Sequence, residues 1–450
     1  MTRILYWNIE KFASNKIANP SFKRQRGGAL KQNQASVQRL NYINTHWGIT
    51  AGGAVSRPDI VVIVEVATGY DGPGVLARGN GPAGALTLLT ALRAVTANPN
   101  WMLVPPLQTG PREAVAVYFD STNLIFTGPW LWPGGVGPAV PPAAPAPATA
   151  AYAAPFVGAL PAAAVPAGTL NTGTAQNQLA AATGFTYAAA HANAGMGKNF
   201  AALRRPYWVT FAEMSGAGAP PVVRDISLFC IHSPANAGAG AYLTALDDLA
   251  EVADGIAANE VRVVLGDFNV NLLDNDAPRT RSDSYDALEG SGYTLGIDSP
   301  GGPPAPLNGW LGYFGTHIKR TSRATYWTTN AQTDYYPGYG YVGSTIIQNF
   351  YSIDNILANY GAGLMAVGPA NVTVLNGIVG SRYNGVAPPV PGNPPVGTYN
   401  LPIRMAGVPF AAPAAQAPPF SAGRQGAFRG WNNYGRIRST SDHLAIVADI

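Results

Sequence analysis

Nine polar or charged side chains in this sequence lie at or beside the ends of short apolar runs. They are Asn8, Glu65, Glu113, His232, Asp267, Asn269, Asp354, Asp442 and His443. Carboxylate and amide oxygens of this kind bind hard divalent cations such as Mg²⁺. A bound cation neutralises charge on phosphoryl oxygens, and imidazoles beside it transfer protons. The set therefore suits metal-assisted hydrolysis of phosphate esters, provided that the fold brings these positions together.

The stretch from Gly266 to Asn269 carries the clearest signal. It is Gly-Asp-Phe-Asn and follows the apolar run 261–265. In an extended chain Phe268 turns to one side while Asp267 and Asn269 turn to the other. Such a carboxylate and amide can hold a water, a metal or a phosphate. A strand followed by an Asx turn is the structural alternative, and it is common in proteins generally.

Apolar and β-branched runs predict the strands that must position these side chains. Residues 242–256 repeat apolar side chains at helical spacing between two of these strands, which predicts a crossover unit of a layered α/β fold. The ends of neighbouring strands form one crevice in such a sheet, so we expect the polar residues to converge. The predicted strands cover 4–8, 59–66, 112–119, 204–211, 225–231, 261–267, 351–358 and 441–450.

Two segments rich in alanine, proline and glycine interrupt this pattern. The first, 121–197, contains no Asp, Glu, Lys or Arg, and the second covers about 361–427. Dense proline disfavours helices and strands. We therefore predict a single catalytic domain over 1–450 with these two segments as insertions. Trp130-Leu131-Trp132 in the first insertion could touch a membrane or a substrate, and docking onto its own domain is the expected alternative.

Bulk composition limits the function classes. The single cysteine, Cys230, excludes an internal disulfide, and the net charge of +4 on 450 residues is too small to establish a nucleic-acid partner. No run has the apolar length of a transmembrane helix, so no stable membrane insertion is expected. Polar residues follow the start of the chain too soon for a signal peptide. A cytoplasmic location is expected, with non-classical export left open, and oligomeric state is not indicated.

The order of these motifs resembles the endonuclease/exonuclease/phosphatase superfamily. It consists of Trp7-Asn8 near the start, the strand that ends in Glu65, Gly-Asp-Phe-Asn, Ile-Asp-Asn-Ile around Asp354, and Ser-Asp-His ending at His443. Gly-Asp-Phe-Asn together with Ser-Asp-His is quite specific, whereas either alone is weak. The resemblance implies a deoxyribonuclease I-like α/β fold, a four-layer α/β/β/α sandwich of two mixed β-sheets with outer helices.

The resemblance also implies roles for the oxygen-bearing side chains. Asn8 and Glu65 match the metal-binding positions of the family, with Asp442 close to the same ion. Asp267 and Asn269 match the pair that orients the attacking water and grips the phosphate. The implied ion is Mg²⁺, with Mn²⁺ as a substitute.

Each histidine of the set has an implied carboxylate partner. His443 matches the imidazole of the terminal motif, and Asp354 matches the acid that holds and polarises it. His232 matches a second histidine that contacts the phosphate or acts as general acid. Glu113 fits the glutamate that backs this histidine in deoxyribonuclease-like members.

The leading functional prediction is a Mg²⁺-dependent endonuclease that cleaves DNA. The cations at 23–31 and the Arg, Lys and aromatic residues near Arg320 fit a nucleic-acid substrate. The alternative is a phosphodiesterase or phosphatase of lipid or inositol-phosphate headgroups, as in sphingomyelinases, which Trp130 and Trp132 would favour. A non-catalytic binding module is the third hypothesis, and the retention of every acid and both histidines disfavours it.

Overall fold

The computed structural model describes most of the predicted strands. The described residues are 1–17, 23–24, 30–31, 39–40, 43–44, 46–47, 49–51, 54–69, 77, 79–104, 106, 108–128, 204, 206–214, 222–235, 238–272, 283–298, 316–318, 350–366, 368–375 and 440–450.

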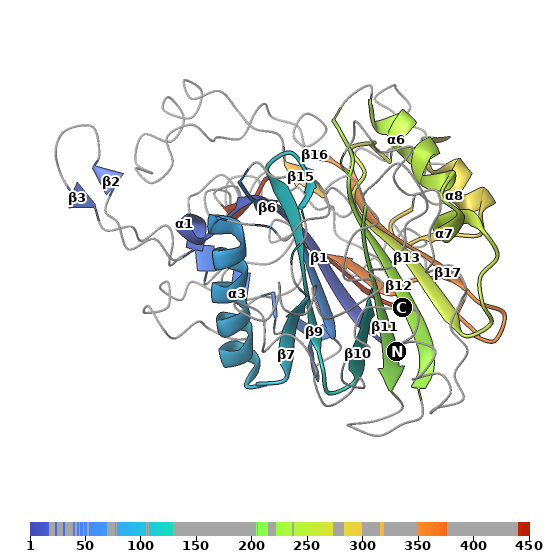
Figure 1. Ribbon diagram of the computed structural model, residues 1–450, viewed down its shortest axis with the longest axis horizontal. Coiled ribbons are helices and arrows are strands. Elements are labelled where there is room, and N and C mark those ends of the chain that lie inside the picture. The colour runs from blue at the N-terminus through green and yellow to red at the C-terminus, as the bar shows by residue number, and fades with distance from the viewer. Residues whose placement is uncertain are drawn as a thin grey trace, which may run out of the picture.

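β1 (Arg3–Phe12) lies near the middle of the first of two large sheets (Figure 1). It pairs in parallel with β6 and antiparallel with β19, and β9 pairs antiparallel with β6. The sheet is therefore mixed. Its order is β18 (Ala370–Val374), β19 (Ile446–Asp449), β1, β6 (Ile60–Ala67), β9 (Glu113–Asp120) and β7 (Trp101–Val104), and β8 (Gln108–Gly110) pairs with β9.

The second sheet repeats this arrangement around another parallel pair. β12 and β13 are parallel, β11 pairs antiparallel with β12, and β17 pairs antiparallel with β13. A helical crossover joins β12 to β13, as a parallel pair requires. The order is β10 (Leu124–Gly128), β11 (Tyr207–Met214), β12 (Val222–His232), β13 (Glu260–Asp267), β17 (Asp354–Tyr360) and β14 (Thr294–Leu295).

The two sheets pack face to face with helices on their outer sides (Figure 1). β1 contacts β13 and β6 contacts β12 across the interface. α3 (Asn80–Thr96) covers β6, β7 and β9 from outside, and three short helices lie beyond the second sheet. These are α6 (Gly238–Asp247), α7 (Ala250–Ala253) and α8 (Asp286–Gly290). The predicted four-layer α/β/β/α sandwich is confirmed.

Smaller elements border the sandwich. They are α1 (Ser14–Ile17), a 3-10 helix (Asp283–Tyr285), and three short hairpin-like pairs, β2 (Lys23–Arg24) with β3 (Leu30–Lys31), β4 (Ile49–Ala51) with β5 (Ala54–Ser56), and β15 (His317–Ile318) with β16 (Phe350–Tyr351).

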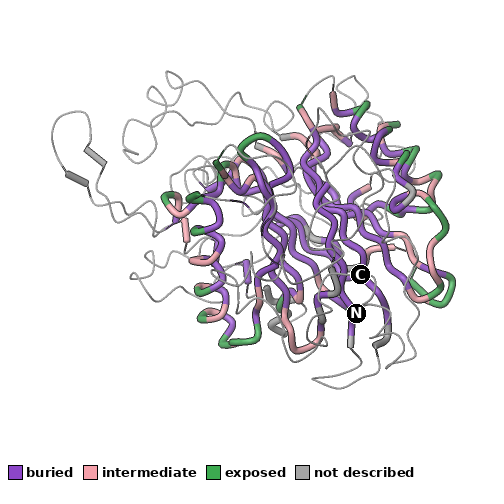
Figure 2. The backbone as a smooth tube through the Cα atoms, in the orientation of Figure 1, coloured by how far each residue is buried: buried purple, intermediate pink, exposed green. Residues whose placement is uncertain are grey.

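The core lies between the sheets and beneath the helices (Figure 2). Residues 60–64 of β6 and all of β13 are buried, because both faces of these strands are covered. This two-sided cover explains why the strands are continuous apolar runs rather than alternating ones. Within the described part of the chain, no helix is both long enough and apolar enough to cross a membrane.

Part of each predicted insertion forms a strand of one of the large sheets. Residues 124–128 form β10 at one edge of the second sheet, and residues 370–374 form β18 at one edge of the first. Leu124, Phe126, Val372 and Val374 are buried. These apolar side chains stabilise edge strands that the surrounding glycine and proline obscured. The rest of each insertion, 129–197 and 376–427, lies outside the described residues.

α3 begins close to the end of β6 because two of its residues lack side chains. A Cβ atom on Gly81 would lie 2.1 Å from the carbonyl oxygen of Ala67, and one on Gly84 would lie 2.6 Å from the amide nitrogen of Ser14. Only glycine permits such approaches. The helix N-terminus is thereby held against the carboxyl end of β6.

Candidate active site

The second sheet aligns three of the predicted residues in one row. The strand register places His232 of β12 beside Asp267 of β13, and Asp267 beside Asp354 of β17. Gly266 is required for this row, because a Cβ atom there would lie 2.1 Å from the carbonyl oxygen of Ile231. The apolar run that precedes Gly266 buries β13, so the sheet fixes the positions of all three side chains.

The first sheet presents its residues through irregular pairing. The register shifts between Asn8 and Phe12 on β1 and between Ile63 and Val66 on β6. Glu65 lies within the second irregularity and has a φ of 58°, which non-glycine residues rarely adopt. Bulges of this kind redirect a side chain out of the strand alternation. Glu65 thereby reaches the amide of Asn8, with 3.2 Å between Oε1 and Nδ2.

His232 and Glu113 form one histidine–carboxylate pair. Nδ1 of His232 lies 2.6 Å from Oε1 of Glu113, and Nε of Arg204 lies 2.9 Å from the other oxygen of Glu113. Burial alone would lower the pKa of His232, but the nearby carboxylates of Glu113, Asp267 and Glu65 outweigh burial and raise it. The imidazole therefore favours the protonated form, with Nε2 left to face the other acids.

His443 and Asp354 form the second pair. Nδ1 of His443 lies 2.8 Å from Oδ2 of Asp354. Burial lowers the pKa of His443, and the opposing charges of Asp354, Asp267 and Asp442 raise it well above the ordinary histidine value. Its Nε2 lies 3.6 Å from Oδ2 of Asp267.

The surroundings of Asp354 hold this second pair rigidly. The phenol of Tyr6 donates to Oδ1 of Asp354 at 2.8 Å, and Oγ1 of Thr316 accepts the backbone N–H of Asp354 at 3.0 Å. Oγ of Ser441 accepts the backbone N–H of His443 at 2.9 Å. Ser441 of the Ser-Asp-His motif is therefore a support for the backbone of His443.

Asn8, Glu65 and Asp267 form a group that fits a divalent cation. Nδ2 of Asn8 lies 3.1 Å from Oδ2 of Asp267 as well as near Glu65. Oδ1 of Asn8 is buried and has no hydrogen-bond partner among the described residues. A half-turn of this amide would place Oδ1 beside two carboxylates, an arrangement that is favourable only around a cation. Three oxygen donors of this type suit a hard divalent ion.

Asp267 lies at the centre of the site. Its Oδ2 is 3.5 Å from Nε2 of His232, a distance similar to that from His443. Burial raises the pKa of Asp267 to about 6, although the two histidines oppose this rise. Oδ1 accepts the backbone N–H of Asn269 at 2.9 Å, and Nδ2 of Asn269 donates to the carbonyl of Ser233 at 2.8 Å. The Asx turn named as the structural alternative is therefore present at Asp267.

Asp442 lies beside a histidine that the sequence did not single out as a site residue. Oδ2 of Asp442 is 3.8 Å from Nε2 of His317, and Oδ1 is 3.9 Å from Nε2 of His443. The rings of His317 and His443 meet edge to face with centroids 4.8 Å apart. The sequence contains only five histidines, and His317 precedes the predicted strand that carries Asp354. This was the signal that could have indicated it.

Arg204 is a second functional residue that sequence reasoning missed. The sequence predicted it as the start of a strand, but β11 begins at Tyr207 and Arg204 precedes it. Its guanidinium contacts Glu113 and also donates to the carbonyl of Ser233 at 3.1 Å. The available signal was a cation at the start of the predicted strand 204–211 together with an acid, Glu113, at the start of the predicted strand 112–119.

Several predicted substrate-binding features lie outside the described residues. These include Trp130-Leu131-Trp132, and Lys319, Arg320 and Arg323 of the cationic aromatic segment. Of the cations at 23–31, Lys23, Arg24 and Lys31 are described as parts of β2 and β3, and Arg26 is not.

Among known proteins, this chain is similar to solved structures at low identity. No protein-family model and no curated protein sequence matches this chain. Among solved structures, the chain is similar to an endonuclease/exonuclease/phosphatase family protein from Leptotrichia buccalis (11% identity, TM-score 0.38, 100% of this chain and 99% of that chain covered). It is also similar to D. rerio TDP2 complexed with single strand DNA product (9%, 0.38, 99% and 97%) and to a Bacteroides thetaiotaomicron mannosyl-6-phosphatase (10%, 0.36, 100% and 99%).

Identities near 10% and TM-scores below 0.5 decide nothing about substrate. The fold rests on the strand order and layers described above, and the site rests on its own distances. The solved structures to which this chain is similar include members of the family that its motifs resemble.

Proposed function

We propose that this protein is a metal-dependent phosphodiester hydrolase that cleaves DNA internally through attack of an activated water on phosphate. The observation that carries the proposal is the pair of histidine–carboxylate contacts, Glu113 with His232 and Asp354 with His443. Both imidazoles direct Nε2 towards Asp267, at 3.5 and 3.6 Å. Two proton donors around one carboxylate suit in-line displacement at a phosphate.

The cation of this proposal is Mg²⁺, with Mn²⁺ as a substitute. Asn8 and Glu65 would hold it, with Asp442 close to the same ion as the motif resemblance implies. A bound divalent cation supplies neutralisation of charge on the phosphoryl oxygens. The buried, unpartnered Oδ1 of Asn8 supports this assignment.

Asp267 acts on the attacking water. Its pKa of about 6 makes it a stronger base than an ordinary carboxylate while leaving it ionised at neutral pH. The backbone N–H of Asn269 donates to Oδ1 of Asp267 and holds it in place, which leaves Oδ2 to act on the water. Asn269 lies in the same turn as Asp267, and its side chain binds the phosphate.

The two imidazoles act on the phosphate. Because each Nδ1 faces a carboxylate, the proton on Nε2 is free to be donated towards the centre of the site. We assign His443 to stabilising charge on the phosphoryl oxygens and His232 to protonating the leaving oxygen. Glu113 and Asp354 keep the imidazoles oriented and protonated.

DNA is the substrate that the sequence and the site support best. The contact between Glu113 and His232 is the feature that the motif resemblance associates with deoxyribonucleases. The net charge of +4 has the sign that a polyanion favours.

Digestion of supercoiled plasmid tests the proposal. The purified protein is incubated with Mg²⁺ or with a chelator, beside His443→Ala and beside Arg57→Gln, whose substitution is remote from the catalytic edge. We expect Mg²⁺-dependent nicking by the wild type and by Arg57→Gln, and none by His443→Ala. Nicking that His443→Ala retains in full would refute the assignment. A folded wild-type protein that leaves the plasmid intact would refute the DNA reaction.

A further inference from the structure

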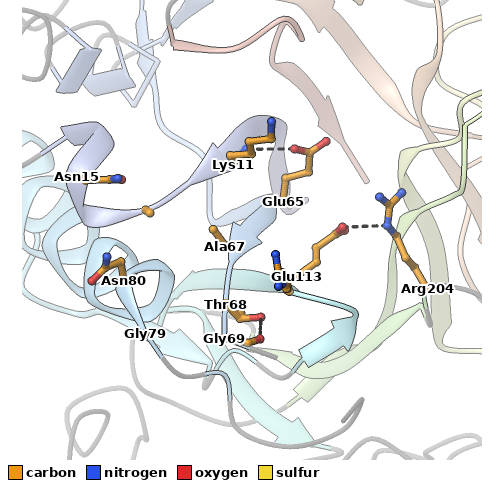
Figure 3. Close-up of a pocket in the computed structure, with 12 residues that line it drawn as sticks. Lys11, Asn15, Glu65, Ala67, Thr68, Gly69, Gly79, Asn80, Glu113 and Arg204 are labelled. Atoms are coloured by element: carbon orange, nitrogen blue, oxygen red, sulfur yellow. Dashed lines mark hydrogen bonds and ion pairs between the residues drawn. The ribbon is translucent and has the colours of Figure 1, made fainter. Parts of the chain in front are cut away.

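A pocket of about 780 Å³ adjoins the catalytic residues on the side of the first sheet (Figure 3). Its volume is in the range of cavities that hold ligands, roughly 300–1,000 Å³. Glu65 and Glu113 of the candidate site form part of its wall, so a substrate that reaches Asp267 extends into it. The remaining wall comes from β1 and α1, from the end of β6 and the residues after it, from the start of α3, from the turn before β9 and from Arg204.

The charged groups of this pocket leave two cations available. Glu113 is engaged by Arg204 and His232, and Glu65 accepts hydrogen bonds from Asn8 and from the backbone N–H of Lys11. The side chains of Lys11 and Arg112 are exposed, and neither has an ion pair or side-chain hydrogen bond among the described residues.

The backbone adopts a rare conformation at three residues of this wall. Five non-glycine residues of the described chain have positive φ, and three of them line the pocket: Lys11 at 50°, Glu65 at 58° and Arg112 at 60°. Left-handed conformations at side-chain-bearing residues persist only where the surrounding structure imposes them, and they gather at functional sites. Lys11, Glu65 and Arg112 therefore share an uncommon backbone conformation at one wall of the pocket.

The start of α3 adds hydrogen-bond donors to the same wall. Gly79 and Asn80 line the pocket, and Gly79 has no side chain with which to cap the helix. The first N–H groups of a helix lack partners within the helix and favour anions. The close packing of Gly81 on Ala67 holds these groups at the pocket.

We propose that this pocket binds the phosphate next to the scissile one in a nucleic-acid strand, through Lys11, Arg112 and the start of α3. This inference rests on the proposed function, because it requires the scissile phosphate to lie at Asp267. A substrate with one phosphate leaves the two cations without a partner. A choline headgroup would bring a third positive charge to them, so the pocket disfavours sphingomyelin.

Kinetics with two substrates test the proposal. The wild type, Arg112→Gln, Lys11→Gln and the charge-matched control Arg57→Gln are assayed on a single-stranded 12-mer and on bis(p-nitrophenyl) phosphate, which has one phosphate. We expect Arg112→Gln to lower the ratio of kcat/KM values, oligonucleotide over small ester, about tenfold or more. Lys11→Gln lowers this ratio less, because its flexible ammonium binds phosphate as a point charge. Arg57→Gln keeps the wild-type ratio.

Binding gives a readout that does not depend on turnover. A fluorescein-labelled 12-mer is titrated in a chelator at several salt concentrations. The slope of log K against log salt should fall by about 0.7 for Arg112→Gln, the value for one lost single-strand phosphate contact, and stay unchanged for Arg57→Gln.

Three results would overturn the proposal: equal losses on both substrates, an unchanged salt slope, or a higher kcat/KM on sphingomyelin vesicles or inositol polyphosphates than on the oligonucleotide. A wild type that hydrolyses neither assay substrate would refute the proposed function instead, and the binding titration would still decide on the pocket.

Discussion

In both sheets a parallel pair of strands ends at the catalytic edge and an antiparallel neighbour begins there. In the first sheet these positions carry Asn8, Glu65 and Glu113, and in the second they carry His232, Asp267 and Asp354. The topology is the same, but the first sheet supplies only oxygen ligands at these three positions. Under the proposed function, one strand arrangement, used twice, supplies the cation ligands Asn8 and Glu65 from the first sheet and the proton-transfer groups His232 and Asp267 from the second.

Each histidine is held by a carboxylate of the opposite sheet. Glu113 of the first sheet holds His232 of the second, and Asp354 of the second holds His443, which leads into β19 of the first. The catalytic pairs therefore exist only where the two sheets meet.

The two pairs differ in what surrounds the carboxylate. Glu113 shares its charge with Arg204, whereas Asp354 is contacted by the neutral hydroxyl of Tyr6. A guanidinium on Glu113 reduces the field that this carboxylate exerts on its histidine. The pKa values of both histidines are raised by their carboxylates, and we expect Glu113 to raise that of His232 less than Asp354 raises that of His443.

Asp267→Asn and Glu65→Gln compare the matching acids at the ends of the second parallel strands. Asp267→Asn should lower kcat on plasmid by about 10⁴-fold, the upper range for loss of a general base. The same substitution should increase the stability of the folded protein above pH 6, although it lowers kcat. Burial raises the folded-state pKa of Asp267 from 3.8 to about 6, so this group favours folding below pH 3.8 and disfavours it above pH 6.

In a chelator at pH 8, Asp267→Asn should therefore unfold at higher urea, with a gain on the order of 3 kcal/mol. Glu65→Gln should lose stability there. Burial raises the pKa of Glu65, but His232, His443 and the hydrogen bonds from Lys11 and Asn8 together lower it by more, so its contribution is present above pH 4.5. Losses of stability in both variants would contradict the contrast.

His443→Ala and His232→Ala compare the two proton donors. We expect kcat to fall by about 10³–10⁴-fold for His443→Ala and about 10²–10³-fold for His232→Ala, within the range of acid–base catalysis. Single-turnover cleavage of a labelled duplex measures both. A larger loss of kcat for His232→Ala than for His443→Ala would contradict this prediction. Circular dichroism checks that each variant is folded.

Asp354→Asn and Glu113→Gln should shift the pH profile by unequal amounts. Activity requires ionised Asp267 and protonated imidazoles, so it should rise through about pH 6 and fall as the histidines deprotonate at higher pH. Removing the charge of Asp354 lowers the pKa of His443 and moves the alkaline limb to lower pH. Glu113→Gln should move it less. A pH–rate profile in which Glu113→Gln gives the larger displacement would contradict the comparison.

Tyr6→Phe should have the smallest effect. It removes one hydrogen bond from Asp354 and should cost roughly 1 kcal/mol of stability. Tyr118→Phe is the matched control, because its hydroxyl donates to the carbonyl of Ala85 away from the site. Urea unfolding should show equal losses of stability for the two variants. Plasmid nicking should show a fewfold loss of kcat for Tyr6→Phe alone.

The sequence predicted the strands well because their patterns are local. The runs ending at Asn8, Glu65 and Asp267 are buried on both faces and read as continuous apolar segments. The motif resemblance then suggested partners for the histidines, and the distances agree with it, while the catalytic roles remain predictions. The local signals at Arg204 and His317 did not identify their partners, because those contacts depend on how distant segments of the chain meet.

The crossing of the histidine pairs between sheets also sets the order in which activity can arise during synthesis. Asn8 emerges from the ribosome early, but His443 is made 435 residues later and β19 must then enter the sheet beside β1. Pairings between segments so far apart form slowly. A ribosome-bound chain thus holds Asn8 and Glu65 without His443, and the candidate site stays incomplete until synthesis of that segment is complete.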